Sequence, residues 1–151
     1  LLSQGYEVVC CVRDKNKFNP PLAFIKKIEI IEVDFLDKNS LKNIPKDIDG
    51  AYYLMHSMSA SKNYADIEKQ SAINFREAVN QSNAKHVVYL SGIINEKTLS
   101  KHLSSRKAVE IELAKGNYHC TTLRAGIIIG SGSASFEIIK DLTEKCEMRN
   151  S

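Results

Sequence analysis

The sequence predicts an α/β fold with a doubly wound parallel sheet. Apolar runs of strand length recur along the chain, and several are nearly continuous rather than alternating, which is typical of strands covered on both faces. Segments with helical periodicity lie between these runs. Strands that alternate with helices favour parallel pairing through right-handed crossovers. Because the sequence contains no internal repeat and no linker rich in Pro, Gly or Ser, residues 1–151 are expected to form a single domain.

Each predicted strand is a short apolar run, and most are rich in β-branched or aromatic residues. The five runs are EVVCCVR at 7–13, IEIIEV at 28–33, AYYLMH at 51–56, HVVYLS at 86–91 and TTLRAGIII at 121–129. Before the first run, LLSQG has the composition of a helix end that is closed by Gly5.

The clearest predicted helix covers residues 66–82, where Ile67, Ser71, Phe75 and Val79 recur on one face. Further helices are predicted over 104–115 and over 134–146, the latter with Phe136, Ile139, Leu142 and Cys146 on one side. A short helical turn is expected near 39–43, with Asp37 or Ser40 as its cap.

Composition argues against several classes of function. The chain has 151 residues and a formal net charge of +3, with its lysines dispersed, so neither a nucleic acid nor a membrane is expected as a partner. The four cysteines form no C-x-x-C pair, which predicts neither a disulfide framework nor a metal site. No apolar run approaches the ~20 residues of a membrane-spanning helix, and the opening residues do not have the pattern expected of a signal peptide. The expected compartment is the cytoplasm.

Ligands of open parallel sheets bind beyond the carboxyl ends of the strands. Polar residues or glycines follow every predicted strand, whereas the residues at the opposite strand ends do not suggest a ligand site. The five places are Arg13–Asp14, Asp34–Phe35–Leu36, His56–Ser57–Met58, Ser91–Gly92 and the stretch 126–132. These five loops are expected to share one edge of the sheet.

Six ordered pieces of the chain resemble a known family. They are GYEVVCCVRD at 5–14, EVDFLD at 32–37, AYYLMHSM at 51–58, HVVYLSGI at 86–93, HLSSRKAVE at 102–110 and LRAGIIIGSGSASFEII at 123–139. Their order resembles the extended and atypical short-chain dehydrogenase/reductases, Rossmann-like NAD(P)-binding proteins that include NAD-dependent epimerases/dehydratases and relatives of the nitrogen-metabolite-repression regulator. The resemblance implies that a first strand and a glycine-rich pyrophosphate loop precede Leu1, and that further segments follow Ser151. The fold of residues 1–151 is therefore expected to be incomplete at both ends.

The resemblance also implies a set of cofactor contacts. Arg13, followed by Asp14, stands where an arginine can pair with the 2′-phosphate of NADP, which favours NADP over NAD; the alternative is a surface arginine in a basic loop. Asp34 matches the acid beside the adenine ring, with Phe35 and Leu36 flanking it, unless Asp34 only caps the turn that follows.

Two further strand ends are implied to approach the cofactor. Leu54, Met55 and His56 end a strand whose backbone lies against the ribose in related proteins. A lone histidine such as His56 is more often structural than catalytic. Ala125 and Gly126 end the last predicted strand, before a loop that the resemblance places near nicotinamide and substrate.

His102 and Arg106 share one helical face with Val109 and Leu113, because the four residues follow at i, i+4, i+7 and i+11. This face is expected to pack on the sheet with its first turn toward the strand ends. In active relatives the spacing is Tyr-x-x-x-Lys, and here His102 replaces the tyrosine and Arg106 the lysine. Arginine stays charged and can bind ribose hydroxyls, while histidine can act as a general acid or base. Ser91 matches the family's catalytic Ser or Thr, or else satisfies a backbone group at the strand end.

The leading expectation is an NAD(P)-binding oxidoreductase of the atypical short-chain type, which uses NADP on a small carbonyl or hydroxyl substrate. Ser91, His102 and Arg106 would be its catalytic residues. One alternative is a non-catalytic NAD(P)-binding module that senses redox state or supports a partner. A nucleotide-sugar epimerase or dehydratase is the third option.

Overall fold

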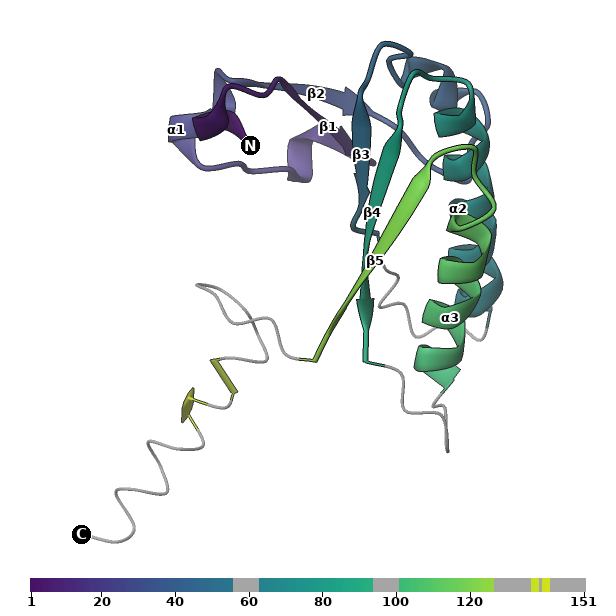
Figure 1. Ribbon diagram of the computed structural model, residues 1–151. Helices are drawn as coiled ribbons and strands as arrows, with labels where there is room; N and C mark the ends of the chain where they lie inside the picture. The colour runs from purple at the N-terminus through teal and green to yellow at the C-terminus, as the bar shows by residue number, and fades with distance from the viewer. Residues whose placement is uncertain (56–62, 94–100, 127–136, 139, 142–151) are drawn as a thin grey trace, which may run out of the picture.

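The computed structural model describes residues 1–55, 63–93, 101–126, 137–138 and 140–141 (Figure 1). Its larger part is a three-stranded sheet with two helices: β3 (Gly50–Tyr53), β4 (His86–Gly92), β5 (His119–Ala125), α2 (Tyr64–Asn80) and α3 (Lys101–Leu113). The smaller part contains β1 (Val8–Val12), β2 (Ile28–Glu32), the short helix α1 (Leu22–Ile25) and the 3-10 turns η1 (Leu2–Gln4) and η2 (Lys15–Lys17), while the turn η3 (Ser40–Asn43) connects toward β3.

All described strand pairs are parallel, which confirms the predicted α/β class. β1 pairs with β2, and β3, β4 and β5 form a second sheet in which β4 is central. The register sets Tyr53 beside Tyr89 and Gly92 beside Ala125, so the three carboxyl ends of the larger sheet lie at one edge.

The larger sheet is covered by α2 and α3 on one face (Figure 1). Burial alternates along β4, and Val87, Tyr89 and Ser91 are buried beneath the helices. On the opposite face Tyr52 and Leu123 remain 54% and 51% exposed. The nearly continuous apolar runs predicted strands covered on both faces, but within the described residues helices cover only this one.

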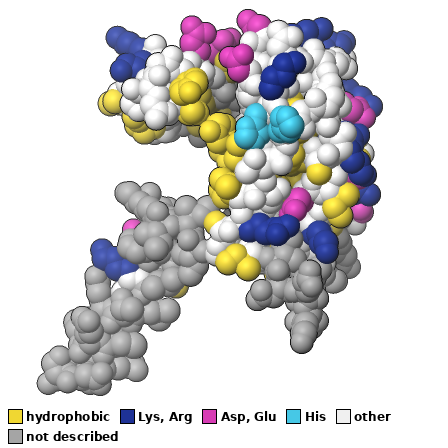
Figure 2. Space-filling model, viewed as in Figure 1, with side chains coloured by type: hydrophobic (Ala, Val, Ile, Leu, Met, Phe, Trp, Pro, Cys, Tyr) yellow, Lys and Arg dark blue, Asp and Glu magenta, His cyan; other side chains and the backbone are white. Residues whose placement is uncertain are grey.

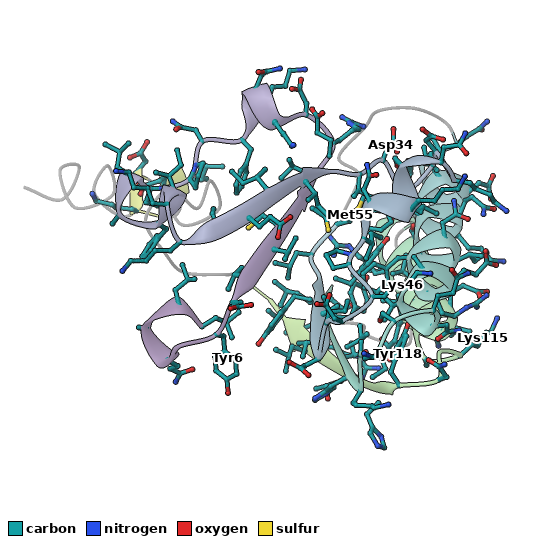
Figure 3. The ribbon with its side chains drawn as sticks, turned by 90° about the horizontal axis from the view of Figure 1, so that it is seen from above. Tyr6, Asp34, Lys46, Met55, Lys115 and Tyr118 are labelled. Carbon is teal, nitrogen blue, oxygen red and sulfur yellow. The ribbon has the colours of Figure 1, made fainter. Side chains whose placement is uncertain are left out.

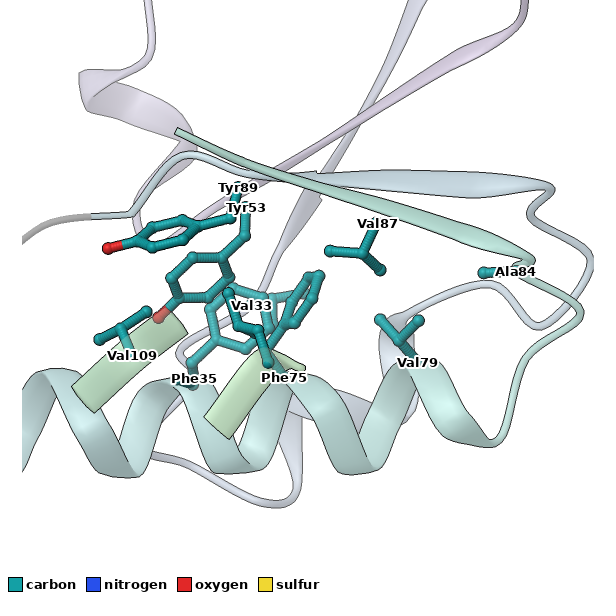
Figure 4. Close-up of a cluster of buried hydrophobic side chains, with 11 residues drawn as sticks. Val33, Phe35, Tyr53, Phe75, Val79, Ala84, Val87, Tyr89 and Val109 are labelled. Atoms are coloured by element: carbon teal, nitrogen blue, oxygen red, sulfur yellow. The ribbon is translucent and has the colours of Figure 1, made fainter. Parts of the chain in front are cut away.

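An aromatic cluster forms the centre of the core (Figure 4). The Tyr53 and Phe75 rings lie 4.8 Å apart, and the Tyr53 and Tyr89 rings 5.8 Å apart, both edge to face. Phe35, which follows β2, packs on Phe75 with ring centroids separated by 5.6 Å. Residues from both sheets and from α2 therefore share one core, and burial of such rings is a large stabilising term.

Polar contacts hold the helices to each other and to the loop after β2. The Asn74 side-chain amide of α2 donates a hydrogen bond to the Phe35 carbonyl over 2.6 Å. Glu112 of α3 accepts from Arg76 of α2 over 2.8 Å and from Lys115 over 2.7 Å. The buried Ser105 hydroxyl of α3 donates to the buried Glu68 carboxylate of α2.

Element boundaries differ from the predicted ones by a few residues. Helix α3 begins at Lys101 rather than at residue 104, so His102 belongs to its first turn. The last strand begins at His119 and ends at Ala125. Gly5 closes η1 as expected, with a positive φ of 85°. The cap of η3 is Asn39, which makes no side-chain cap bond, so the expectation of Asp37 or Ser40 at that position was wrong.

Two expectations fall largely outside the described residues. Of the helix predicted over 134–146, only residues 137–138 and 140–141 are described, and they are helical. His56 and the glycine-rich stretch from residue 127 onward also lie outside the described part.

Within the part that is described, no helix combines the length and the apolar character that crossing a membrane requires.

Candidate functional site

We call the residues at the carboxyl ends of the five strands the carboxyl rim and define it as residues 13–14, 34–36, 54–55, 91–92 and 125–126; one part of it belongs to each of the two sheets. The Val33 amide donates to the Val12 carbonyl over 2.9 Å and so joins the ends of β1 and β2. The Phe35 ring lies 6.5 Å from the Tyr53 ring and joins the end of β2 to that of β3. In the larger sheet, strand register aligns the carboxyl ends of β3, β4 and β5. Figure 3 shows the side chains of Asp34, which follows β2, and Met55, which follows β3.

At the end of β1, Arg13 and Asp14 differ in how they are engaged. The Asp14 carboxylate accepts the Asn16 amide over 2.9 Å and pairs with Lys17 at 3.4 Å, so it caps the turn η2. The Asn16 hydrogen bond, more than the neighbouring ammonium group, lowers the pKa of Asp14. Arg13 is exposed and makes no ion pair within the described residues. The Arg13 guanidinium is thus the group of this pair that can receive an anion.

At the end of β2, the Asp34 carboxylate accepts the Leu36 amide over 2.9 Å. Ser40 bonds the Asp34 backbone twice, since its hydroxyl oxygen accepts from the amide at 2.9 Å and donates to the carbonyl at 2.8 Å. Phe35 is only 5% exposed and belongs to the core, while Leu36 is 48% exposed. Of the two residues expected to flank a ligand ring, only Leu36 presents its side chain to the rim.

At the end of β3, the side chains of Leu54 and Met55 are 60% and 44% exposed. Like Leu36 after β2, they expose apolar side chains at the end of a strand. Apolar side chains that stay in contact with water at a strand end are available to cover a planar ring.

At the end of β4, Ser91 and Arg106 come together. The Arg106 guanidinium donates to the Leu90 carbonyl over 3.3 Å, and the Tyr89 phenol donates to the Arg106 carbonyl over 3.4 Å. Ser91 is 4% exposed, and its hydroxyl makes no hydrogen bond of normal geometry within the described residues. The Ser91 hydroxyl therefore keeps the capacity to bond an incoming oxygen atom.

Tyr89 connects these two groups electrostatically. Burial raises the pKa of Tyr89, whereas the nearby Ser91 hydroxyl and the Arg106 guanidinium oppose that rise. Our sequence interpretation did not include Tyr89 in the site. The sequence could have indicated Tyr89, because side chains alternate between the two faces of a strand and HVVYLS therefore places Tyr89 on the same face as Ser91.

The remaining predicted residues are placed only in part. The backbone of His102 lies in α3 one turn before Arg106, and its side chain lies outside the described residues. Ala125 pairs with Gly92 in the sheet. Gly126 follows at the rim, where a Cβ atom would lie 3.2 Å from the Ile93 side chain. No group of three or more His, Cys, Asp or Glu residues among those described is arranged to hold a metal ion.

Comparison with known proteins identifies the family. Residues 1–125 match the model of a protein family described as NAD(P)H-binding. The chain belongs to this NAD(P)H-binding family. The match confirms the resemblance to Rossmann-like nicotinamide-dinucleotide proteins. No match was found among curated proteins.

Solved structures with the same fold include reductases and epimerases of sugar nucleotides. The enzyme WbmG of Bordetella bronchiseptica in complex with NAD is 18% identical with a TM-score of 0.71, over 95% of this chain and 54% of that one. The triphenylmethane reductase of Citrobacter sp. complexed with NADP(H) is 16% identical with a TM-score of 0.64, over 79% and 40%. UDP-N-acetylglucosamine 4-epimerase of Bacillus cereus is 19% identical with a TM-score of 0.64, over 87% and 49%. The chain thus spans about half the length of these proteins or less.

Proposed function

We propose that this NAD(P)H-binding protein is a cytoplasmic oxidoreductase that binds NADP along the carboxyl rim and oxidises or reduces a small hydroxyl or carbonyl substrate. The 3.3 Å hydrogen bond from Arg106 to the Leu90 carbonyl carries this proposal. It holds a permanent cation beside Ser91, a buried hydroxyl that makes no hydrogen bond of normal geometry to the described residues. A cation beside an available hydroxyl can orient a substrate oxygen and stabilise negative charge that develops on it.

The residues of the rim fit a dinucleotide. Such a ligand has flat rings, sugar hydroxyls and anionic phosphates, and the rim offers half-exposed apolar side chains between two arginines. Arg13 would pair with the 2′-phosphate, and Asp34 would accept a hydrogen bond from the adenine amine beside Leu36. The ends of β3 and β5, at Leu54, Met55, His56, Ala125 and Gly126, would line the ribose and the nicotinamide.

Three residues of this chain would serve the reaction. The bound nicotinamide would supply or accept the hydride. The Ser91 hydroxyl would donate a hydrogen bond to the substrate oxygen and orient it. His102 would hold the proton that accompanies the hydride, because an imidazole changes charge near neutral pH. Arg106 would bind the nicotinamide ribose hydroxyls with a guanidinium that stays charged throughout.

A second candidate is a non-catalytic module that binds NAD(P) and senses redox state or supports a partner protein. It is favoured by the family resemblance, in which His102 stands where active relatives have a tyrosine and Arg106 where they have a lysine. A shorter, differently shaped acid delivers a proton along a different path. The third candidate, an epimerase or dehydratase acting on a nucleotide sugar, is supported by the fold shared with an epimerase of this kind.

Calorimetric titration with NADPH and NADH, followed by a turnover assay on a panel of carbonyl compounds, tests the proposal. We expect NADPH to bind in the micromolar range and at least one carbonyl compound to oxidise it. Binding without turnover on any compound would favour the sensing module. If neither dinucleotide binds below about 1 mM, both candidates fail.

A further inference from the structure

Two histidines stand side by side at the amino ends of β4 and β5. His86 and His119 are direct partners in the parallel register of the two strands. Both are exposed, and the two imidazoles lie next to each other on the surface (Figure 2). Neither residue belongs to the carboxyl rim.

The side chains of the pair lie on the same face of the sheet. The next residues along the two strands, Val87 and Cys120, belong to or pack against the core. Successive side chains of a strand point to opposite faces, so His86 and His119 point away from α2 and α3. Thr121, two residues after His119, confirms this direction, because its hydroxyl oxygen lies 2.8 Å from Nε2 of His86.

The spacing of the pair suits chelation of one ion. Neighbouring strands are about 4.8 Å apart. Two nitrogen ligands at about 2.0–2.1 Å from a tetrahedral ion are roughly 3.4 Å apart, a separation that the two rings reach by rotation about their side-chain bonds. We propose that His86 and His119 bind a first-row divalent metal ion, of which Ni²⁺, Cu²⁺ and Zn²⁺ are the ions that imidazole ligands prefer.

Thr121 acts as a positioning residue for this site. Its hydroxyl engages Nε2 of His86, which leaves Nδ1 of the same ring for the ion. With two protein ligands and an exposed position, the remaining coordination positions are filled by water. The bound ion therefore exchanges readily with the solvent and can accept an external ligand.

The site is independent of the proposed dinucleotide function. Six residue steps of β4 separate His86 from Gly92, which corresponds to about 20 Å at ~3.3 Å per residue. An ion at the amino ends does not touch a ligand at the carboxyl rim. Failure of one proposal therefore leaves the other unaffected.

Calorimetric titration of the protein with NiCl₂ and ZnCl₂ at neutral pH tests the site, with MgCl₂ as the control for a hard cation that prefers oxygen ligands. We expect one Ni²⁺ or Zn²⁺ ion to bind and Mg²⁺ to give no signal. His86→Ala and His119→Ala should each weaken binding at least tenfold, and Thr121→Val should weaken it severalfold.

Substitution of the other two histidines, His56→Ala and His102→Ala, provides matched controls that should bind the ion like the parent protein. Thermal unfolding of each variant identifies loss of folding, and His86→Gln with His119→Gln repeats the test with polar side chains. The proposal is overturned if the parent protein binds no ion, or if all four histidine-to-alanine variants bind it equally well. NADPH affinity of His86→Ala and His119→Ala should stay unchanged, which separates this site from the rim.

Discussion

The Arg106 guanidinium donates to the Leu90 carbonyl over 3.3 Å, while the Tyr89 phenol donates to the Arg106 carbonyl over 3.4 Å. This reciprocal pair of contacts fastens the first half of α3 to the end of β4. Ser91 is the next residue along the strand, so the position of the proposed ribose-binding cation and that of the substrate hydroxyl are set by the same two bonds.

Removal of the Arg106 guanidinium should weaken dinucleotide binding. We expect Arg106→Met to reduce NADPH affinity at least tenfold, because it removes both a cation and the bond to Leu90. Arg106→Lys should give an intermediate loss, since lysine keeps the charge without the planar fork. Titration with NADPH measures both, with the exposed neighbour Lys107→Met as the control. Equal affinity of Arg106→Met and the parent protein would remove Arg106 from the site.

Removal of the Tyr89 hydroxyl should weaken the attachment of α3 to the end of β4, because the Tyr89 phenol donates to the Arg106 carbonyl. Tyr89→Phe keeps the ring in the aromatic cluster and deletes the bond to Arg106, at an expected cost of about 1 kcal/mol in the free energy of unfolding. Tyr53→Phe removes a phenol from the same cluster without this bond and is the matched control. Urea unfolding measures the two costs, and NADPH titration should show weaker binding for Tyr89→Phe alone.

Arg13 should decide between the two nicotinamide dinucleotides. We expect Arg13→Ala to weaken NADPH binding about 10- to 100-fold, the loss of a charge-assisted contact to the 2′-phosphate, and to leave NADH binding within about twofold. Lys26→Ala, another exposed cation of the smaller sheet region, is the control. An equal loss of NADH affinity in Arg13→Ala would refute the phosphate contact.

His102 should separate the catalytic candidate from the sensing module. In the catalytic case, His102→Ala should lower turnover at least 100-fold, because it removes the general acid, and should leave NADPH affinity nearly unchanged. Steady-state kinetics and titration on the same preparation provide the two measurements. Unchanged turnover in His102→Ala would show that a group other than His102 transfers the proton that accompanies the hydride.

Glu112 should make stability depend on pH in the acid range. Its hydrogen bond with Lys115, and to a lesser extent that with Arg76, lowers the pKa of Glu112 below its ordinary value of 4.5. A carboxyl group whose pKa falls on folding stabilises the protein above the ordinary value, and that stabilisation is lost as the pH falls through the lowered pKa. We expect Glu112→Gln to cost about 1–3 kcal/mol at neutral pH and much less at about pH 3.

Urea unfolding at the two pH values measures this difference for Glu112→Gln. Glu77→Gln is the control, because Glu77 is 52% exposed and its oxygen lies 4.0 Å from Arg76, a contact expected to contribute little. A cost for Glu112→Gln that is the same at both pH values would show that the carboxylate charge is not involved.

Much of the fold was predictable from the spacing of apolar residues in the sequence. Runs such as HVVYLS have strand length and β-forming residues, and the strand β4 matches it to within one residue. The short helix α1 was missed, since its four residues, Leu22–Ile25, are too few to show a helical period. Helix α3 begins at Lys101, three residues before the predicted start at residue 104, although Ser100 is a residue type that often caps helices and the spacing of His102 and Arg106 already counted His102 as helical.

Only those parts of the candidate site that depend on the alternation of side chains along one strand were predictable from the sequence. Alternation in VDFL already assigns Val33 and Phe35 to one side and Asp34 and Leu36 to the other, and the structure follows this division. The Asn74 bond to the Phe35 carbonyl spans 39 residues, and the Arg106 bond to Leu90 spans 16. No pattern within a single sequence encodes such pairings, because they depend on how the layers pack.

The separation of the strands into two sheets has a consequence for the isolated polypeptide. β1 pairs only with β2, and β3 only with β4, so within the described residues each leaves a line of peptide groups without a neighbouring strand. Such borders offer backbone N–H and C=O groups to a further strand. An extended segment placed between β1 and β3 could therefore pair with both and join the two sheets into one.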